Sequence, residues 1–258
     1  MSNVPDEQFS MLDPRHQTER DREFAGGMEA YFARSLGTNM DKLRNFAKYV
    51  PRQTLTMFLA KHAIFQRVLG VHGHMIECGV FLGGGLMAWA QLSAIYEPVN
   101  HPRRIVGFDT FTGFAGIHDK DRSDSNLECI AEGALSTDAY KDVQEGIRLY
   151  DLNRPIGHIP RVELVVGDAV QTIPNYVQKN PHLVVAMLYL DFDLYEPSKV
   201  AIQSFLPRMP RGAVMVFDEL DDAAWPGETQ AVLEAIGLRN LRIERFPFAS
   251  QISFAVLD

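Results

Sequence analysis

The most informative stretch of the sequence is Met75–Gly85, which reads MIECGVFLGGG. Apolar residues typical of a buried strand lead to the carboxylate of Glu77, and Gly79 follows two positions later. Glycines let the backbone approach a bulky ligand because they carry no Cβ, and a carboxylate accepts hydrogen bonds from hydroxyl or ammonium groups. The G-x-x-x-G-G-G spacing differs from the G-x-G-x-x-G of dinucleotide-binding turns. The stretch predicts a strand, a glycine turn and a helix that suit a nucleoside ligand, although such turns also serve packing alone.

The composition is that of an ordinary globular protein. The chain has 258 residues, of which 46% are apolar and 22% charged, and a chain of this size buries about three quarters of its unfolded surface. The net charge of −8 argues against nucleic-acid binding, which needs a basic surface. The two cysteines, Cys78 and Cys129, provide no disulfide framework. We expect no secretory leader and no membrane span, and therefore a cytoplasmic protein.

The first 70 residues differ from the rest of the chain in their pattern of apolar and polar residues. Residues 1–23 are polar and charged with little periodicity, which predicts an arm that is mobile or held by a partner. Apolar spacing then predicts one helix over 41–50, ending at Pro51, and a second from the N-cap Thr54 to Leu69. We interpret His62 as a packed core residue rather than a ligand. The side chains expected to face inward are Leu43, Phe46, Ala47 and Val50, then Leu55, Phe58, Leu59 and Phe65.

After residue 70, short apolar runs alternate with helix-length segments, which predicts a mostly parallel, doubly wound sheet. Two final runs, Leu241–Phe246 and Gln251–Leu257, predict an antiparallel hairpin at one sheet edge. The long loop 111–140 is expected to be a functional lid or disordered. The predicted parallel strands are 74–78, 104–108, 162–166, 183–190 and 212–217. The predicted helices between and after them are Leu86–Tyr96, Tyr140–Leu149, Ala169–Gln178, Ser198–Leu206 and Thr229–Ile236.

An acidic residue ends every predicted parallel strand. In open α/β sheets, ligands bind beyond the carboxyl ends of the strands. Any one acid there could simply cap the following helix, but an acid at every strand end favours a shared site. The acids are Glu77, Asp109, Asp168, Asp191 and Asp218.

Two of these acids suit a nucleoside. Asp109 is placed to receive ribose hydroxyls, with Phe111 close enough to pack on a purine, and the alternative is an N-cap beside a core aromatic. Asp168 could accept a hydrogen bond from an adenine amino group, and helix capping is again the alternative.

The segment YLDFDLYE suggests a metal site. Because side chains in a strand alternate, Asp191 and Asp193 can face the same way, and the next strand supplies Asp218 and Glu219. Carboxylates brought together repel one another unless a cation compensates them, and Mg²⁺ prefers such oxygen ligands. The alternative is a solvated acidic rim without metal. The end of the later strand is uncertain by a few residues, so Asp221 and Asp222 are rival ligands.

Other catalytic patterns are absent from the sequence. It contains no G-x-x-x-x-G-K-[ST] motif, no H-E-x-x-H, no C-x-x-C and no G-x-S-x-G.

Taken together, the motifs resemble those of the class I S-adenosylmethionine-dependent methyltransferases. More narrowly, they resemble the macrocin O-methyltransferase family, which modifies deoxysugars of antibiotics of the macrolide, aminocoumarin and enediyne type. The resemblance covers most of the chain from about residue 40 onward. It rests on IECGVFLGG (76–84), FDTFTGF (108–114), GD with TIP (167–174) and DFDLYE (191–196).

The resemblance implies a seven-stranded Rossmann-like sheet in a methyltransferase domain over 71–258, preceded by a helical extension over 1–70. Glu77, Gly79 and Gly83 would hold the methionine end of the cofactor, Asp109 the ribose and Asp168 the adenine. The metal ligands would be Asp191, Asp218 and Glu219, with Asp193 as the general base. The family usually has an aspartate where this chain has Glu219, which leaves the metal identity open. The resemblance also implies a homo-oligomer in which N-terminal segments reach neighbouring subunits.

The expected reaction is methyl transfer to a hydroxyl of a sugar or glycoside, with Asp193 removing the proton. A catechol-type O-methyltransferase acting on an aromatic diol is the alternative. A nicotinamide-dependent oxidoreductase is disfavoured by the glycine spacing, and a non-catalytic protein that keeps the cofactor as a structural ligand remains open. The sequence does not define the acceptor, the hydroxyl that is methylated, or whether the sugar is nucleotide-linked or already on an aglycone.

Overall fold

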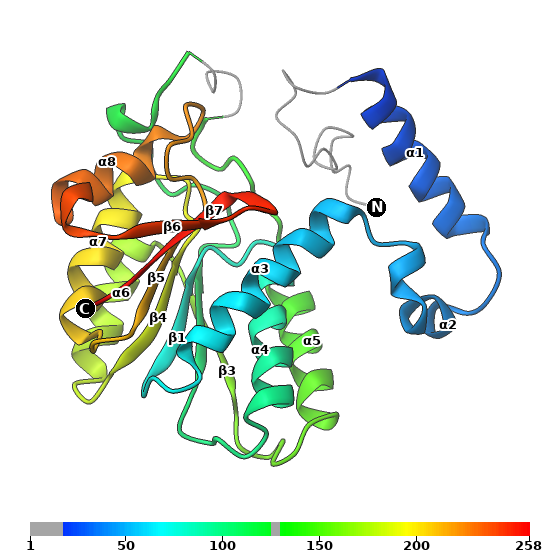
Figure 1. The fold of residues 1–258 in the computed structure, drawn as a ribbon, viewed down its shortest axis with the longest axis horizontal. Coiled ribbons are helices and arrows are strands. Elements are labelled where there is room, and N and C mark those ends of the chain that lie inside the picture. The colour runs from blue at the N-terminus through cyan, green and yellow to red at the C-terminus, as the bar shows by residue number, and fades with distance from the viewer. Residues whose placement is uncertain (1–17, 125–129) are drawn as a thin grey trace. The chain divides into compact units, whose positions relative to one another are not determined.

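A computed structural model describes residues 18–124 and 130–258 of the chain (Figure 1). The chain divides into two compact units, of which the first ends at Met57 and the second runs from Phe58 to Asp258. The domain boundary at residue 70 that follows from the sequence remains a prediction. Among the described residues, none of the helices combines the length and apolar character that crossing a membrane requires.

The first unit contains α1 (Glu19–Arg34), α2 (Asn39–Arg44) and the short 3₁₀ helix η3 (Phe46–Lys48). Part of the predicted arm is therefore helical: the side chain of Asp21 accepts a hydrogen bond from the backbone N–H of Thr18 (2.9 Å), which caps the start of α1. The rest of that arm lies outside the described residues. The single helix predicted over 41–50 is wrong, because the chain leaves helical geometry at Asn45 and resumes as η3.

The face predicted to be buried in this region is also wrong. Leu43 and Phe46 are exposed, whereas Lys42 and Tyr49 are buried. The ammonium of Lys42 donates to the carbonyl of Phe32 and lies over its ring, and the ring of Tyr49 packs against Tyr31 and Phe32 with centroids 5.6 and 5.2 Å apart. A lysine and a tyrosine thus make the contacts to α1 that the sequence pattern assigned to aliphatic residues.

The second unit is built on one seven-stranded sheet with the order β3-β2-β1-β4-β5-β7-β6. β1 to β5 are parallel, and β7 pairs antiparallel with both β5 and β6. The doubly wound sheet and the antiparallel C-terminal hairpin are thereby confirmed. The strands are β1 (His74–Cys78), β2 (Ile105–Asp109), β3 (Val162–Val166), β4 (Val185–Leu190), β5 (Val214–Phe217), β6 (Ile243–Phe246) and β7 (Ala249–Val256).

Helices cover both faces of the sheet. In Figure 1, α4 and α5 lie on one side of the sheet, and α6 and α7 lie on the other. β4 and β5 are buried along their whole length, which explains their continuous apolar sequences because a strand covered on both faces has no polar side. The helices are α4 (Gly84–Tyr96), α5 (Tyr140–Leu152), α6 (Ala169–Lys179), α7 (Tyr195–Phe205) and α8 (Pro226–Ala235), with 3₁₀ helices η4 (Asp119–Asp121), η5 (Leu206–Arg208) and η6 (Leu238–Asn240).

The buried face of helix α3 (Arg52–Val68) also differs from the prediction. Phe58 and Leu59 were expected to face inward but are 40% and 47% exposed. Phe65 is buried as predicted, and Lys61, which was not expected to face inward, is buried as well. His62 is half-buried, and its Nε2 lies 2.6 Å from the hydroxyl oxygen of Tyr96. The buried stripe of α3 therefore includes a lysine, whose partner belongs to the functional site.

Candidate active site

The chain order places a topological switch between β1 and β4. From β1 the chain proceeds outward through β2 and β3, then returns to the other side of β1 with β4 and β5. Ligands bind at such a switch, beyond the carboxyl ends of the strands.

Unusual backbone geometry is concentrated at this edge. Four non-glycine residues that follow parallel strands have positive φ angles: 51° at Phe81, 57° at Phe111, 62° at Asp193 and 70° at Asp221. Such conformations are uncommon outside glycine, and they are concentrated at active sites because only the surrounding structure can maintain them. The loops that follow β1, β2, β4 and β5 are thus held in constrained shapes around one edge of the sheet.

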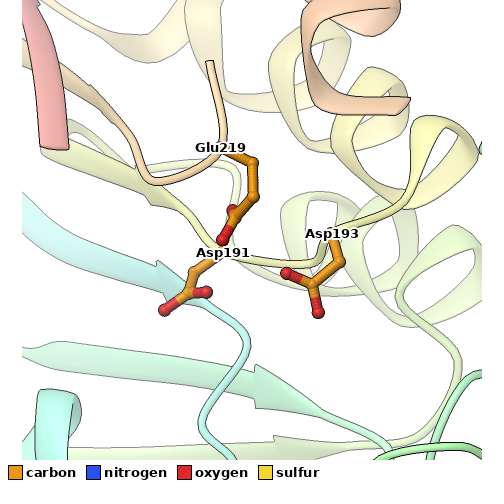
Figure 2. Close-up of side chains that lie close together, drawn as sticks. All are labelled: Asp191, Asp193 and Glu219. Atoms are coloured by element: carbon orange, nitrogen blue, oxygen red, sulfur yellow. The ribbon is translucent and has the colours of Figure 1, made fainter. Parts of the chain in front are cut away.

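Three carboxylates meet at this edge. Asp191 and Asp193 follow β4 and Glu219 follows β5, and one carboxylate oxygen from each lies within 4.8 Å of the others (Figure 2). We call these residues the acidic cluster. Glu219 Oε2 is buried and has no hydrogen-bond partner. A buried carboxylate oxygen without a donor is costly, so this oxygen of Glu219 is available to a ligand.

The environment raises the pKa of every member of the acidic cluster. Burial is the main cause, and the charge of Asp218 is the second. The pKa values of Asp191 and Glu219 lie well above their usual range, and that of Asp193 is raised to about 7. The carboxylates therefore cannot all ionise at neutral pH without a compensating cation.

Asp218, a predicted metal ligand, lies beside the cluster but is not one of the three converging residues. Its carboxylate accepts a hydrogen bond from the hydroxyl of the buried Tyr189. The rival ligands Asp221 and Asp222 belong to the turn before α8, where Asp222 accepts a hydrogen bond from the N–H of Ala224 (2.7 Å). The structure thus brings together Asp191, Glu219 and the predicted base Asp193.

Glu228 is a residue that the sequence reasoning missed. It lies in the first turn of α8 and is completely buried. Its Oε1 accepts the backbone N–H of Glu219 (3.3 Å), and its Oε2 has no partner. Burial and the charges of Asp218 and Asp193 raise its pKa well above the usual range. Acids are common in the first turn of a helix, so nothing in the sequence marked this one as special.

The glycine turn after β1 is built around Glu77. This side chain is 2% exposed, and its Oε1 accepts hydrogen bonds from Lys61 Nζ and Trp89 Nε1, both at 3.2 Å. Its Oε2 is buried and has no partner. A Cβ at Gly85 would lie 2.3 Å from Glu77 Oε1, so only glycine fits over the carboxylate.

The two other glycines predicted to approach the cofactor also have packing roles. Gly79 has a φ of 94°, and a Cβ there would lie 1.9 Å from the carbonyl oxygen of Asp191. The turn after β1 therefore touches the backbone that begins the acidic cluster. Gly83 has a φ of 85° and precedes α4, where a Cβ would meet Val143 at 2.9 Å. Gly79 thus brings the glycine turn directly against the acidic cluster.

Asp109 organises the same turn. Its Oδ2 accepts the backbone N–H groups of Val80 (2.7 Å) and Phe81 (2.8 Å), and its Oδ1 accepts that of Phe111 (2.6 Å). The ring of Phe111 is buried against Tyr140, with centroids 5.5 Å apart. The carboxylate thereby ties the loop after β2 to the turn after β1. Contacts of Asp109 and Phe111 with a nucleoside remain predictions.

Asp168 has the capping role that the sequence left open. Its Oδ1 accepts the backbone N–H of Val170 (2.9 Å) at the start of α6. A contact with adenine remains a prediction.

Comparison with known proteins identifies the family. Residues 26–241 match the macrocin-O-methyltransferase (TylF) family. The chain belongs to this family. No curated protein sequence matches the chain.

Solved structures agree with this assignment. The crystal structure of CalS11, a calicheamicin methyltransferase, is 31% identical with a TM-score of 0.89, covering 96% of this chain and 97% of that one. The apo structure of CalS11, described as a TDP-rhamnose 3'-O-methyltransferase of calicheamicin biosynthesis, is 30% identical with a TM-score of 0.81, covering 95% and 99%. The O-methyltransferase NovP shares the fold at 19% identity and a TM-score of 0.61, covering 78% and 79%. The protein is therefore an S-adenosylmethionine-dependent O-methyltransferase with the class I fold, as the sequence motifs predicted.

The residues at this edge of the sheet fit the two groups that the resemblance to macrocin O-methyltransferases implies. These are S-adenosylmethionine as the methyl donor and a divalent cation. The unpartnered Oε2 of Glu77 is a buried acceptor at the glycine turn, which suits an ammonium donor. The acidic cluster offers several closely spaced oxygen atoms, including the unpartnered Oε2 of Glu219, which suits a hard cation such as Mg²⁺.

The loop predicted to be a lid is anchored at η4. The buried carboxylate of Asp121 accepts the backbone N–H of Tyr195 (2.6 Å) at the start of α7, and Lys120 forms an ion pair with Glu234 of α8. The loop is thus fixed to the two helices that begin next to the acidic cluster. Its closure over a cofactor remains a prediction, and residues 125–129, with Cys129, lie outside the described part of the chain.

Proposed function

We propose that this enzyme transfers a methyl group from S-adenosylmethionine to a hydroxyl of a deoxysugar in antibiotic biosynthesis, with a divalent cation in the acidic cluster. The observation that carries the proposal is the convergence of Asp191, Asp193 and Glu219 beside the glycine turn. Similarity to CalS11, a TDP-rhamnose 3'-O-methyltransferase, over nearly the whole chain favours a nucleotide-linked sugar as the acceptor.

Asp193 is the proposed general base. Methyl transfer is an in-line displacement in which the acceptor oxygen forms a bond to the methyl carbon as the carbon–sulfur bond breaks, so positioning supplies much of the rate. The acceptor hydroxyl must lose its proton, and a base is most effective when its pKa is close to the working pH. In the absence of a cation, burial and the charge of Asp218 raise the pKa of Asp193 to about 7. A bound cation would lower this pKa, so that Asp193 is ionised and can accept a proton at neutral pH. The positive φ of Asp193 fixes where its carboxylate is presented.

The proposed ligands of the cation are Asp191, Asp218 and Glu219. Asp191 and Glu219 already converge, and Asp218 is close enough for its charge to raise the pKa of both. A divalent cation would allow these carboxylates to stay ionised together and would make a neighbouring hydroxyl more acidic. Asp193 would then receive the proton of that hydroxyl.

An acceptor assay tests the proposal. Chelator-treated protein is incubated with S-adenosylmethionine and TDP-rhamnose, and S-adenosylhomocysteine formation is measured before and after addition of Mg²⁺. We expect turnover only with the added cation, and none with catechol as the acceptor. Activity that chelation leaves unchanged would contradict the metal assignment, and methylation of catechol in place of the sugar would contradict the acceptor class.

The proposal includes a homo-oligomer. The first unit exposes several large apolar side chains, and exposed apolar surface commonly marks an interface. Its exposed members are Phe24, Phe32, Leu36, Met40, Leu43 and Phe46. Light scattering of the purified protein should give a mass that is a multiple of 29.0 kDa. Replacement of Leu43 and Phe46 by Ser should lower that mass, and a wild-type monomer would contradict the proposal.

A further inference from the structure

Lys61 is a buried cation in the functional site that the family roles do not explain. It is 6% exposed, although lysine is almost never buried without a partner. Its Nζ lies 3.2 Å from Glu77 Oε1, 3.6 Å from the ring centroid of Tyr189 and 4.7 Å from that of Trp89. The ammonium is therefore held by one carboxylate and two aromatic faces, which attract a cation.

The two oxygens of Glu77 are treated differently. Oε1 accepts from both Lys61 and Trp89, whereas Oε2 is buried without a donor. Nearly all buried polar atoms have a partner, so an unpartnered oxygen at a ligand-binding turn points to a missing donor. A Cβ at Gly85 would lie 2.3 Å from Glu77 Oε1 and 3.1 Å from Lys61 Nζ, which places the ion pair directly against the start of α4.

The charge of Glu77 depends on this lysine. Burial raises the pKa of Glu77, and the charge of Lys61 is the strongest influence in the opposite direction. Without the lysine, a carboxyl group buried in this way would tend to be neutral, and a neutral carboxyl binds an ammonium group far less strongly than a carboxylate does.

We propose that Lys61 is a positioning residue for the methyl donor. It holds Glu77 anionic and anchors Oε1, which leaves Oε2 to accept the α-ammonium of the amino-acid end of S-adenosylmethionine. The inference rests on the proposed function, because it assumes that this end of the donor lies at the glycine turn. Lys61 acts through Glu77 and makes no contact of its own with the donor.

Three ligands that differ in their amino-acid end distinguish a positioning role of Lys61 from a merely structural role and from direct contact with the donor. S-adenosylhomocysteine carries the whole amino-acid end, decarboxylated S-adenosylhomocysteine keeps only the ammonium, and 5'-methylthioadenosine has neither group. Their affinities are measured by titration calorimetry for wild type and for Lys61→Met, which keeps most of the length of the side chain without its charge. Lys199→Met is the matched control, since Lys199 also lies over a tyrosine ring, 5.0 Å from the centroid of Tyr195, and pairs with Glu234.

We expect Lys61→Met to weaken the binding of S-adenosylhomocysteine and of its decarboxylated form equally, by about tenfold or more, because a hydrogen bond between two charged groups is stronger than one to a neutral carboxyl. The affinity for 5'-methylthioadenosine should stay unchanged in both variants. An equal loss for all three ligands would show a merely structural lysine and overturn the proposal. Loss confined to the ligand with a carboxylate would mean direct contact with Lys61 and would also overturn it.

A double-mutant cycle tests whether Lys61 acts through Glu77. Lys61→Met with Glu77→Gln should bind S-adenosylhomocysteine no more weakly than Glu77→Gln alone, since the lysine has nothing left to position. Additive losses would contradict the proposal. Should wild type fail to bind S-adenosylhomocysteine at all, the proposed function would be wrong, whatever the variants show.

Discussion

The glycine turn and the acidic cluster both bury carboxylates, but they compensate the charge in different ways. Glu77 is paired with Lys61, whereas no member of the acidic cluster forms an ion pair with a lysine or arginine in the described part of the chain. Gly79 brings the two regions into direct contact. The glycine turn therefore contains its own positive partner for Glu77, and we propose that a cation from solution compensates the acidic cluster. The predictions below test this difference.

The largest effect is expected from Asp193→Asn. The amide cannot accept the proton of the acceptor hydroxyl, so turnover should fall by about 10²–10⁴-fold, the range typical of general bases. Binding of S-adenosylhomocysteine should be retained, because the glycine turn and its ion pair are unchanged. Single-turnover kinetics and calorimetry measure the two properties. A variant that keeps near-normal turnover would show that Asp193 is not the base.

A pair of glycine substitutions tests the packing over Glu77. Gly85→Ala places a methyl group 2.3 Å from Glu77 Oε1, and overpacking of this kind costs about 1–3 kcal/mol. We expect a lower free energy of unfolding and weaker S-adenosylhomocysteine binding. Gly84→Ala is the control, because a Cβ there meets no atom within 4 Å apart from its chain neighbours and its own helix backbone, and it should be neutral or stabilising by up to about 1 kcal/mol. Equal behaviour of the two variants would contradict the account of the turn.

Glu228 allows charge and hydrogen bonding to be separated. Glu228→Gln keeps an acceptor for the N–H of Glu219 but cannot ionise, so the metal-free protein should unfold at a higher Tm at pH 8. Glu228→Ala removes the acceptor and leaves that N–H unsatisfied, so its Tm should fall. The corresponding variants of Glu145, an exposed residue of α5 that pairs with Arg148, are the control. For Glu145, the Gln variant should not have a higher Tm than wild type. A Gln variant no more stable than wild type would mean that Glu228 adds no repulsion.

The stability of the metal-free protein should depend on pH, because the carboxylates of the acidic cluster repel one another when they ionise. The pKa of Asp193 is about 7 in the folded protein against an ordinary value of 3.8. The folded state therefore holds the proton more tightly, and this stabilisation, complete below pH 3.8, is lost as the pH rises toward about 7. The Tm of metal-free protein should fall over this window, and the increase caused by Mg²⁺ should grow with pH. A metal-free Tm that rises from pH 5 to 7 would contradict this assignment.

The sequence predicted the sheet well because apolar patterning reports burial directly. β1 and β3 begin and end at the predicted residues, and β4 and β5 end where expected, since both are apolar throughout. The acids at the strand ends were also visible in the sequence, because an acidic residue lies at the end of each predicted parallel strand.

The misses share one physical cause. Lys42, Lys61 and Glu228 are all buried charged residues, and apolar patterning assigns charge to the surface. Their burial depends on partners that belong to other elements or loops: a carbonyl of α1 for Lys42, Glu77 for Lys61 and the backbone of Glu219 for Glu228. No local pattern shows such partners. The face of α2 and part of the face of α3 were mispredicted for the same reason.

Titration calorimetry of Mg²⁺ into chelator-treated protein, without methyl donor or acceptor, measures directly whether the acidic cluster binds a cation. We expect one bound ion per chain, at least about tenfold weaker binding for Asp191→Asn, and unchanged binding for Asp142→Asn, which removes an exposed acid on α5. Wild-type protein that binds no divalent cation, or an Asp191→Asn variant that binds it as tightly as wild type, would contradict the claim that these carboxylates form a cation site.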